Sequence, residues 1–255
     1  MKKRVRKHLV NHPIDINGST LDFLEHFQEE MPLKHICHEV QIEKTHHLQA
    51  QNDKQREYIR AIIESPQVIV VGSSGTGKTY IASKMAVQMF SKGEFKKIIL
   101  TKPNVSCSKS IGFFPGTLEE KISPWVVPFT DIFQQDFGAS QFEYLLKKKI
   151  IDIIPFEVMR GRTFDDAFVI VDEAQNTSIV EIKMLLTRIG KRSKIILNGD
   201  IRQSDIRETS GLSYAIELAN KYGIPVPVIE FTVNDIVRSD ICALWVKAFE
   251  EREAA

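Results

Sequence analysis

Eight residues, Gly72-Ser73-Ser74-Gly75-Thr76-Gly77-Lys78-Thr79, constrain this chain more than any other stretch. They follow a short apolar run at 68–71 and lead into a segment of helical periodicity that begins at Tyr80. A strand, a glycine-rich turn and a helix in this order are the setting of a phosphate-binding loop, whose backbone N–H groups surround an anion at the positive end of the helix. An ordinary βα turn is the alternative, and the complete pattern disfavours it. We therefore predict that the chain binds a nucleoside triphosphate.

Within this loop, Lys78 can reach the β- and γ-phosphates, and the Thr79 hydroxyl can ligate Mg²⁺. Guanine-specific enzymes usually carry an Asn-Lys-x-Asp segment, but the nearest stretch, at 220–223, lacks the aspartate. This favours ATP. The predicted nucleotide contacts are Gln55, Gly72, Ser73, Ser74, Gly75, Thr76, Gly77, Lys78, Thr79 and Tyr80.

Length and composition set broad limits on the function. The 255 residues suffice for one large α/β domain with a small extension, and the formal charge of +1 gives no global attraction to nucleic acid. We find neither an apolar run of membrane-spanning length nor an export signal, and the three scattered cysteines fit a reducing cytoplasm. All seven histidines lie at or before His47, so histidine-based catalysis is excluded from the rest of the chain.

The order of apolar runs predicts an α/β domain with a mainly parallel sheet flanked by helices, over residues 52–255. We expect residues 1–51 to be an N-terminal extension with a basic tip and a short amphipathic helix. Strands are expected at 68–71, 97–101, 150–154, 167–171, 194–197 and 226–230. Helices are expected at 52–64, at 118–137 with breaks at Pro124 and Pro128, at 141–149, from about 178, at 211–222 and at 236–251. We expect the last helix to pack through Ile241, Leu244, Trp245 and Phe249.

An acidic pair, Asp172-Glu173, follows the predicted strand at 167–171. Ligands bind at the carboxyl edge of parallel α/β sheets, and carboxylates beside a buried strand are costly unless they face metal or water. We predict that Asp172 binds Mg²⁺ and that Glu173 polarises the attacking water. The alternative for Asp172 is to cap the helix that begins near Ser178.

Three further side chains have two interpretations each. Gln203 can hydrogen-bond the γ-phosphate or be an ordinary exposed loop residue, and Gln55 can read the adenine edge or be an exposed helix residue. Arg238 is a candidate arginine finger, but an ion pair with Asp235 or Glu230 is equally consistent with its position. The residues that we predict to be catalytic are Lys78, Glu173, Gln203 and Arg238.

Cationic and aromatic side chains predict a face for single-stranded nucleic acid. Aromatic rings stack on bases with little sequence preference, and cations follow the phosphates. Burial of both phenylalanines in the core is the alternative. The predicted residues are Lys102, Lys109, Phe113, Phe114, Arg160 and Arg162.

Several of these segments together resemble the PhoH-like ATPases, over roughly residues 52–250. The segments are 72–79, 99–103, 112–116, 159–163, 171–176, 199–203 and 231–238. That family is similar to the first motor domain of superfamily 1 helicases, which implies a RecA-like core. The resemblance implies that Gln55 reads adenine, that Gln203 contacts the γ-phosphate, and that Lys102-Pro103 touches single-stranded nucleic acid. It does not cover the residues before Asn52.

The leading functional hypothesis is a Mg²⁺-dependent ATPase coupled to RNA or single-stranded DNA. The alternative is an ATP-driven regulatory or assembly switch without a nucleic-acid substrate; a small-molecule kinase is disfavoured because nothing marks an acceptor-binding lid. Superfamily 1 helicases use two motor domains, whereas this chain has room for one. We therefore expect a homo-oligomer, a hexameric ring in which Arg238 completes a neighbour's site. A monomer in which Arg238 acts in cis, or a second protein that completes the site, is the competing hypothesis.

Overall fold

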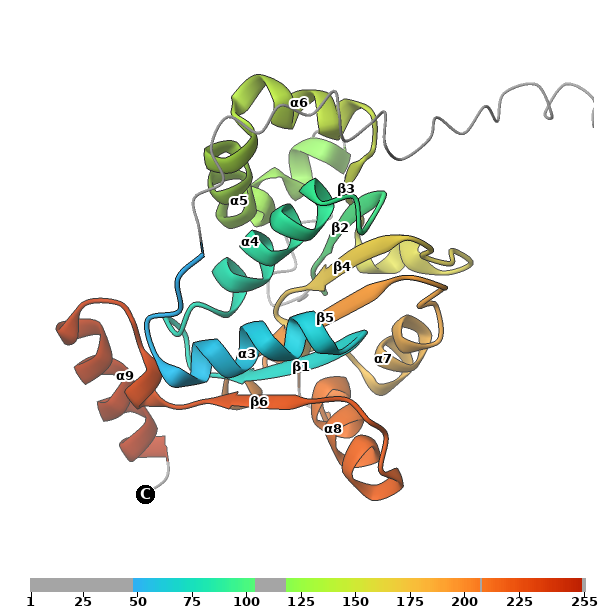
Figure 1. Ribbon diagram of the computed structural model, residues 1–255. Helices are drawn as coiled ribbons and strands as arrows, with labels where there is room; N and C mark the ends of the chain where they lie inside the picture. Colours follow the sequence, from blue (N-terminus) through green and yellow to red (C-terminus); the bar gives the residue numbers. More distant parts are fainter. Residues whose placement is uncertain (1–47, 104–117, 207, 254–255) are drawn as a thin grey trace, which may run out of the picture. The chain divides into compact units, whose positions relative to one another are not determined.

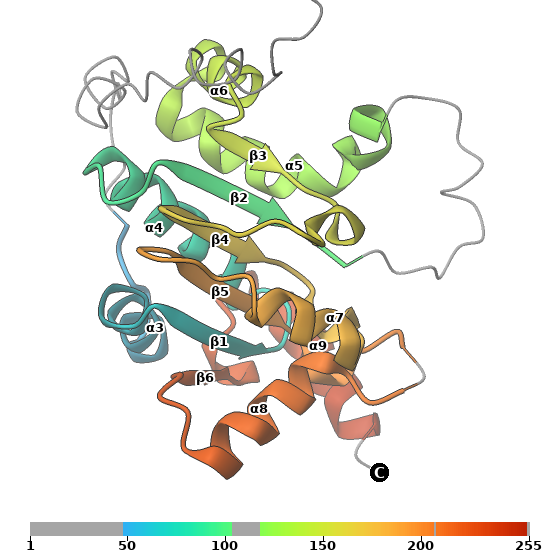
Figure 2. The same cartoon turned by 90° about the vertical axis from the view of Figure 1, so that its right-hand side faces the viewer.

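A single parallel sheet of six strands organises the described part of the chain. The computed structural model describes residues 48–103, 118–206 and 208–253. The strand order across the sheet is β3-β2-β4-β5-β1-β6, and every neighbouring pair is parallel. Figure 2 shows this order from β3 at the top to β6 at the bottom. The strands are β1 (Gln67–Gly72), β2 (Lys97–Thr101), β3 (Ile151–Ile153), β4 (Ala167–Val171), β5 (Lys194–Gly199) and β6 (Val228–Phe231).

Helices cover both faces of this sheet. The helices are α3 (Asp53–Glu64), α4 (Lys78–Ser91), α5 (Leu118–Phe137), α6 (Ala139–Lys147), α7 (Ile179–Leu186), α8 (Gly211–Tyr222) and α9 (Asp240–Glu253). Side chains alternate between the faces of a strand. Along β1, Val68 and Val70 pack in the apolar cluster of α3 to α6, whereas Ile69 and Val71 pack in the cluster of α7 and α8. Figures 1 and 2 show α3 and α4 on one face and α7 and α8 on the other. The predicted α/β fold, a parallel sheet flanked by helices, is confirmed.

Two helices differ from the sequence-based expectation in more than the position of their ends. Pro124 and Pro128 do not break α5, which is continuous from Leu118 to Phe137. Phe129, Phe133 and Phe137 on this helix are buried in the core, and this packing outweighs the loss of backbone hydrogen bonds at the prolines.

The last helix, α9, does not pack through the apolar residues that we expected. Their side chains are between 58% and 62% exposed, so the prediction was wrong about what they contact. The rings of Trp245 and Phe249 stack on each other, with centroids 5.7 Å apart. Periodicity shows that one face of a helix is apolar, but it does not show which surface covers that face. The exposed residues are Ile241, Leu244, Trp245 and Phe249.

The strand register brings the chemically interesting segments to one edge. Because all strands are parallel, their carboxyl ends share that edge. Val71 at the end of β1 pairs with Gly199 of β5, and Thr101 at the end of β2 pairs with Val171 of β4. The phosphate-binding loop, the acidic pair and the segment after β5 therefore begin side by side. Among the helices formed by the described residues, none has the length and apolar character that crossing a membrane requires.

Candidate active site

The loop between β1 and α4 adopts an anion-binding conformation. Gly75 and Gly77 have φ values of +87° and +89°, in the left-handed region that favours glycine. Gly77 caps the N-terminus of α4, where the helix dipole is positive. The Lys78 Nζ donates hydrogen bonds to the carbonyl oxygens of Gly72 and Ser73, at 2.6 and 2.8 Å. The lysine is thus held against its own loop, beside the position that a phosphate would take.

A pocket of about 530 Å³ opens at this loop. It gathers side chains from the ends of β1, β4 and β5, from α3, α4 and α5, and from the segment before α9. Five of the sequence-predicted groups meet here: the phosphate loop, the acidic pair, Gln55, Gln203 and Arg238. Residues that line the pocket include Gln55, Ser74, Gly75, Gly77, Lys78, Thr79, Tyr80, Pro128, Ile132, Asp172, Glu173, Asp200, Gln203 and Arg238.

Thr79 and Asp172 form the oxygen pair that was predicted to hold Mg²⁺. The Thr79 Oγ1 donates to the Asp172 Oδ1 at 2.9 Å. Burial, together with the neighbouring charge of Glu173, raises the pKa of Asp172 above its ordinary value. A divalent cation would relieve both effects, and Mg²⁺ needs few protein ligands because it keeps several waters and takes phosphate oxygens. Within the described residues there is no cluster of three or more His, Cys, Asp or Glu side chains suited to a metal. The donor set therefore fits Mg²⁺ bound with a nucleotide.

The surroundings of Lys78 have opposing effects on its pKa. Burial lowers the pKa of its ammonium, while the carboxylates of Asp200, Asp172 and Glu173 raise it; the nearby Arg238 lowers it slightly further. A desolvated ammonium surrounded by carboxylates interacts strongly with an added polyphosphate. These carboxylates repel a free polyphosphate, so the site suits one that carries Mg²⁺.

Glu173 is held by its backbone and by two neighbours. Its φ of +53° is in the left-handed region, which is uncommon for a residue with a side chain and is found at functional sites. One carboxylate oxygen, Oε2, accepts a hydrogen bond from the Gln175 Nε2 at 2.6 Å. The other, Oε1, lies 3.9 Å from the Lys102 Nζ.

Two residues at this site were not assigned a role from the sequence, Gln175 and Asp200. The buried Gln175 accepts the Asp200 backbone N–H at its Oε1, at 3.0 Å, so its amide joins the segment after β4 to the segment after β5. Burial raises the pKa of the Asp200 carboxyl, which lies close enough to affect Lys78. Both belong to motifs that the sequence singled out, at 171–176 and 199–203, and those motifs were the available signal.

Gln55 is buried, so the alternative interpretation of this residue as an exposed helix glutamine was wrong. Only 3% of it is accessible. Its Nε2 donates to the Thr76 carbonyl at 3.0 Å, and its Oε1 accepts the Gln51 N–H at 2.8 Å. A Cβ on Gly77 would approach the Gln55 Nε2 to 3.0 Å. Gln55 therefore lies directly against the phosphate-binding loop and lines the pocket.

Arg238 lines the pocket of its own chain. The Val237 N–H donates to the Gly75 carbonyl at 3.1 Å, and a Cβ on Gly75 would lie 3.0 Å from the Arg238 Cδ. The Asp235 carboxylate instead accepts the backbone N–H and hydroxyl of Thr232, both at 2.9 Å. The segment before α9 thus fastens the arginine over the phosphate loop.

The predicted nucleic-acid residues are only partly described. Lys102 follows β2 and points toward Glu173, as given above. Arg160 is exposed directly after the 3₁₀ turn Phe156–Met159, and Arg162 lies 3.8 Å from Asp152 on β3. The remaining predicted members, Lys109, Phe113 and Phe114, lie outside the described residues.

Comparisons with known proteins give relatives of high similarity over most of this chain. A PhoH-like protein of Bacillus subtilis (strain 168) is 43% identical over 201 residues, which are 78% of this chain and 62% of the relative. Protein PhoH of Escherichia coli (strain K12) is 37% identical over 204 residues, which are 78% of this chain and 57% of that protein. The match therefore spans less than two thirds of each relative's own length.

Solved structures with a similar arrangement are more distant. The UvsW helicase from bacteriophage T4 has a TM-score of 0.47 and 12% identity, over 80% of this chain and 69% of that chain. The Hef helicase domain of Pyrococcus furiosus has a TM-score of 0.44 and 13% identity, over 71% of this chain and 37% of that chain. The sequence pattern of the PhoH-like proteins matches residues 47–250, which include every residue of the pocket described above, and the chain belongs to the PhoH-like protein family.

Proposed function

We propose that the chain is a Mg²⁺-dependent ATPase whose turnover is coupled to single-stranded nucleic acid, RNA or DNA. One observation carries the ATPase proposal. A single pocket collects an anion-binding loop at a helix N-terminus, a hydroxyl and carboxylate pair suited to Mg²⁺, and a second carboxylate placed for water. Family membership supports a P-loop ATPase.

The proposed chemistry assigns one task to each side chain. Lys78 leaves its loop carbonyls to bind the β- and γ-phosphates, Glu173 accepts a hydrogen bond from the attacking water, and Gln203 contacts the γ-phosphate. Arg238 adds positive charge as the phosphoryl group is transferred. Mg²⁺, held through Thr79 and Asp172, would supply charge neutralisation on the phosphates.

Adenine recognition is proposed at the end of the pocket that α3, α4 and α5 form. The side-chain Nε2 and Oε1 of Gln55 each have one hydrogen-bond partner in the chain. One N–H and one lone pair therefore remain for the edge of a base. Tyr80, which is 44% exposed, and the apolar side chains of Pro128 and Ile132 line the same pocket and suit a purine ring.

Coupling to nucleic acid is supported by the position of its predicted cations. Lys102 follows a strand whose carboxyl end faces the active site, and Arg160 and Arg162 lie on the segment between β3 and β4. Cations in such positions bind phosphates without reading sequence.

The alternative function, an ATP-driven assembly switch, is favoured by the exposed apolar face of α9. Exposed large side chains that lie together indicate a surface that another molecule covers. This face also supports the proposed homo-oligomer, for which a hexameric ring remains our proposal.

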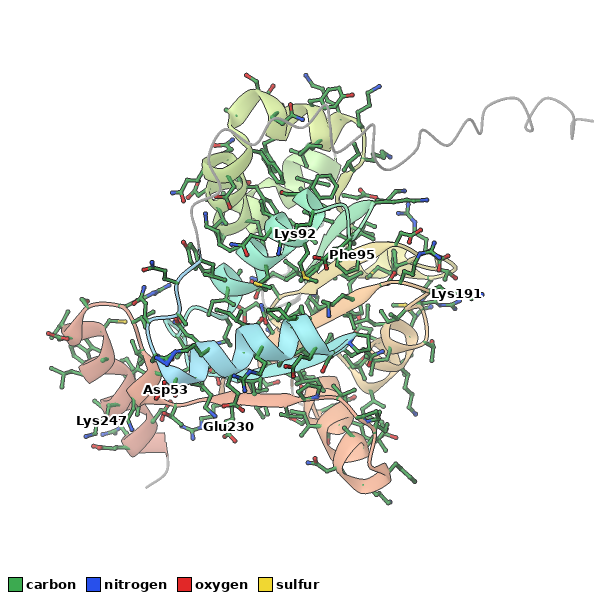
Figure 3. The ribbon with its side chains drawn as sticks, viewed as in Figure 1. Asp53, Lys92, Phe95, Lys191, Glu230 and Lys247 are labelled. Atoms are coloured by element: carbon green, nitrogen blue, oxygen red, sulfur yellow. The ribbon has the colours of Figure 1, made fainter. Side chains whose placement is uncertain are left out.

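Steady-state turnover of ATP and GTP, with and without polyuridylate or polythymidylate, tests these proposals. We expect ATP to be preferred, single strands to accelerate turnover, and Lys78→Ala to lower kcat/KM on the order of 10²–10³-fold. Lys92→Ala is the matched control, because the exposed Lys92 follows the far end of the same helix (Figure 3). At about 1.5 Å per residue it lies roughly 20 Å from Lys78.

Each part of the proposal can be contradicted by a separate result. Equal turnover in Lys78→Ala and Lys92→Ala would remove the ATPase assignment. Turnover that neither polynucleotide changes, together with no binding of labelled strands, would remove nucleic acid and favour the assembly switch.

A further inference from the structure

Lys102 and Glu173 are neighbours because of the strand register. Thr101 and Val171 are the last paired residues of β2 and β4, and the Asp172 N–H continues the ladder by donating to the Thr101 carbonyl at 3.0 Å. The residues that follow both strands therefore leave the sheet together. The resulting distance from the Lys102 Nζ to the Glu173 Oε1 is 3.9 Å.

The two partners of the Glu173 carboxylate differ in how firmly they are held. Gln175 is 1% exposed, and besides its two amide contacts its backbone carbonyl accepts the hydroxyl of Ser210 at 2.7 Å. The side chain of Lys102 is 33% exposed and has a long flexible stem. One oxygen of Glu173 is thus fixed by a rigid amide, while the other faces a cation that can move away.

A phosphodiester would compete for this ammonium. Lys102 is predicted to touch single-stranded nucleic acid, and the 42% exposure of Glu173 leaves water access to its carboxylate. A phosphodiester bound at Lys102 takes up N–H donors of this ammonium and so weakens its hold on Glu173. Binding of a strand at Lys102 therefore changes the surroundings of the Glu173 Oε1.

We propose that Lys102 restrains Glu173 in the absence of nucleic acid, and that the phosphate backbone of a bound single strand releases it. In the restrained state the ammonium competes with the attacking water for Oε1. When a phosphate takes the ammonium, Oε1 is free to accept that water, while Gln175 keeps the carboxylate in place. This inference rests on the proposed ATPase function and describes its regulation; Lys102 is a positioning residue.

The main test is the turnover of Lys102→Met without any polynucleotide. Methionine keeps an unbranched chain but has no charge, so we expect kcat to rise about two- to fivefold, the size of effect that partly exposed ion pairs support. KM for ATP should stay unchanged, because Lys102 does not line the nucleotide pocket. Polyuridylate, which we expect to accelerate the wild type, should accelerate this variant less.

Two companion variants separate the restraint from a loss of structure. Lys97→Met removes an exposed lysine at the opposite end of the same strand and should leave kcat unchanged. Lys102→Arg keeps the charge and should keep the low basal turnover. In the Glu173→Gln background, Lys102→Met should produce no rise, because the effect acts through the carboxylate.

Several results would overturn the inference while leaving the ATPase intact. The first such result requires that polyuridylate accelerates the wild-type protein. If the basal kcat of Lys102→Met is then equal to or below that of Lys97→Met, no restraint exists. A rise that persists in the Glu173→Gln background shows that Lys102 acts elsewhere. Failure of the proposed function is recognised differently, since the wild type itself would then lack ATP turnover or any response to single strands.

Discussion

At the scale of single residues, Glu173 has the most specific prediction. Glu173→Gln keeps the shape of the side chain but removes the negative charge that polarises water, so we expect ATP binding to persist while hydrolysis falls by about 10²–10⁴-fold. Binding of a fluorescent ATP analogue and single-turnover hydrolysis with Mg²⁺ measure the two effects separately.

The matched control for this variant is Glu217→Gln on α8, since Glu217 is exposed on the face of the sheet away from α4. Hydrolysis by Glu173→Gln within tenfold of that control would take Glu173 out of the proposed chemistry. Loss of nucleotide binding would instead indicate a structural role.

Local chemistry explains which site residues the sequence could predict. Lys78, Thr79 and Asp172 lie in short patterns whose spacing already implies their neighbours, and the structure brings them into one pocket. Gln55 was predicted to contact the nucleotide although its burial was not expected, and Gln175 was assigned no role. A glutamine is exposed in most helices and turns, and only the packing of distant segments buries these two against the loop and the acidic pair.

At the scale of elements, the contact of α4 with α5 is fixed by a buried ion pair. The Lys84 Nζ lies 2.6 Å from the Asp136 Oδ1, and the side chains are 1% and 3% exposed. Lys84→Met leaves the carboxylate without its partner, so we expect the free energy of unfolding to fall by about 3–5 kcal/mol. Urea denaturation followed by circular dichroism measures this.

The double variant Lys84→Met/Asp136→Leu is the control for the ion-pair argument. Replacing both charges by apolar groups of similar volume removes the unpaired charge, so most of the lost stability should return. A single variant that is as stable as wild type, or a double variant that is less stable than the single one, contradicts the argument.

Element boundaries followed the strength of the local pattern. The strand at 167–171 and the helix at 211–222 agree with the structure residue for residue, because a continuous apolar run marks the strand, apolar periodicity marks the helix, and the ends of both are marked in the sequence. The predictions of breaks in α5 and of packing through the apolar face of α9 were wrong, because both features depend on contacts with residues distant in the sequence. Proline lowers helix propensity, but tertiary packing decides whether a helix continues.

At the scale of the whole molecule, the position of Arg238 predicts how subunits behave when mixed. The sequence left open whether this arginine acts in its own chain or in a neighbour, and its side chain lines the pocket of its own chain. We expect Arg238→Ala to lower kcat on the order of 10³-fold, as loss of an arginine finger does. Mixing Arg238→Ala with Lys78→Ala subunits should restore no turnover, because neither chain then has a complete site.

Turnover of the mixture above the sum of its separate components would contradict action in cis and support a ring with shared sites. Light scattering of the same samples during turnover reports whether the subunits associate at all. Each variant alone, at the total protein concentration of the mixture, is the necessary reference.

The position of β1 in the sheet has a consequence for synthesis on the ribosome. This strand is the first of the sheet to be made, yet both of its neighbours, β5 and β6, come late in the chain. At a synthesis rate of roughly 5–20 residues per second, β1 waits about 6–25 s for β5 to appear. During that time its apolar run has no strand to pair with, and unpaired strands of this kind are prone to aggregate. Slow translation, or a chain truncated before β5, should therefore increase dependence on chaperones far more than loss of α9 does.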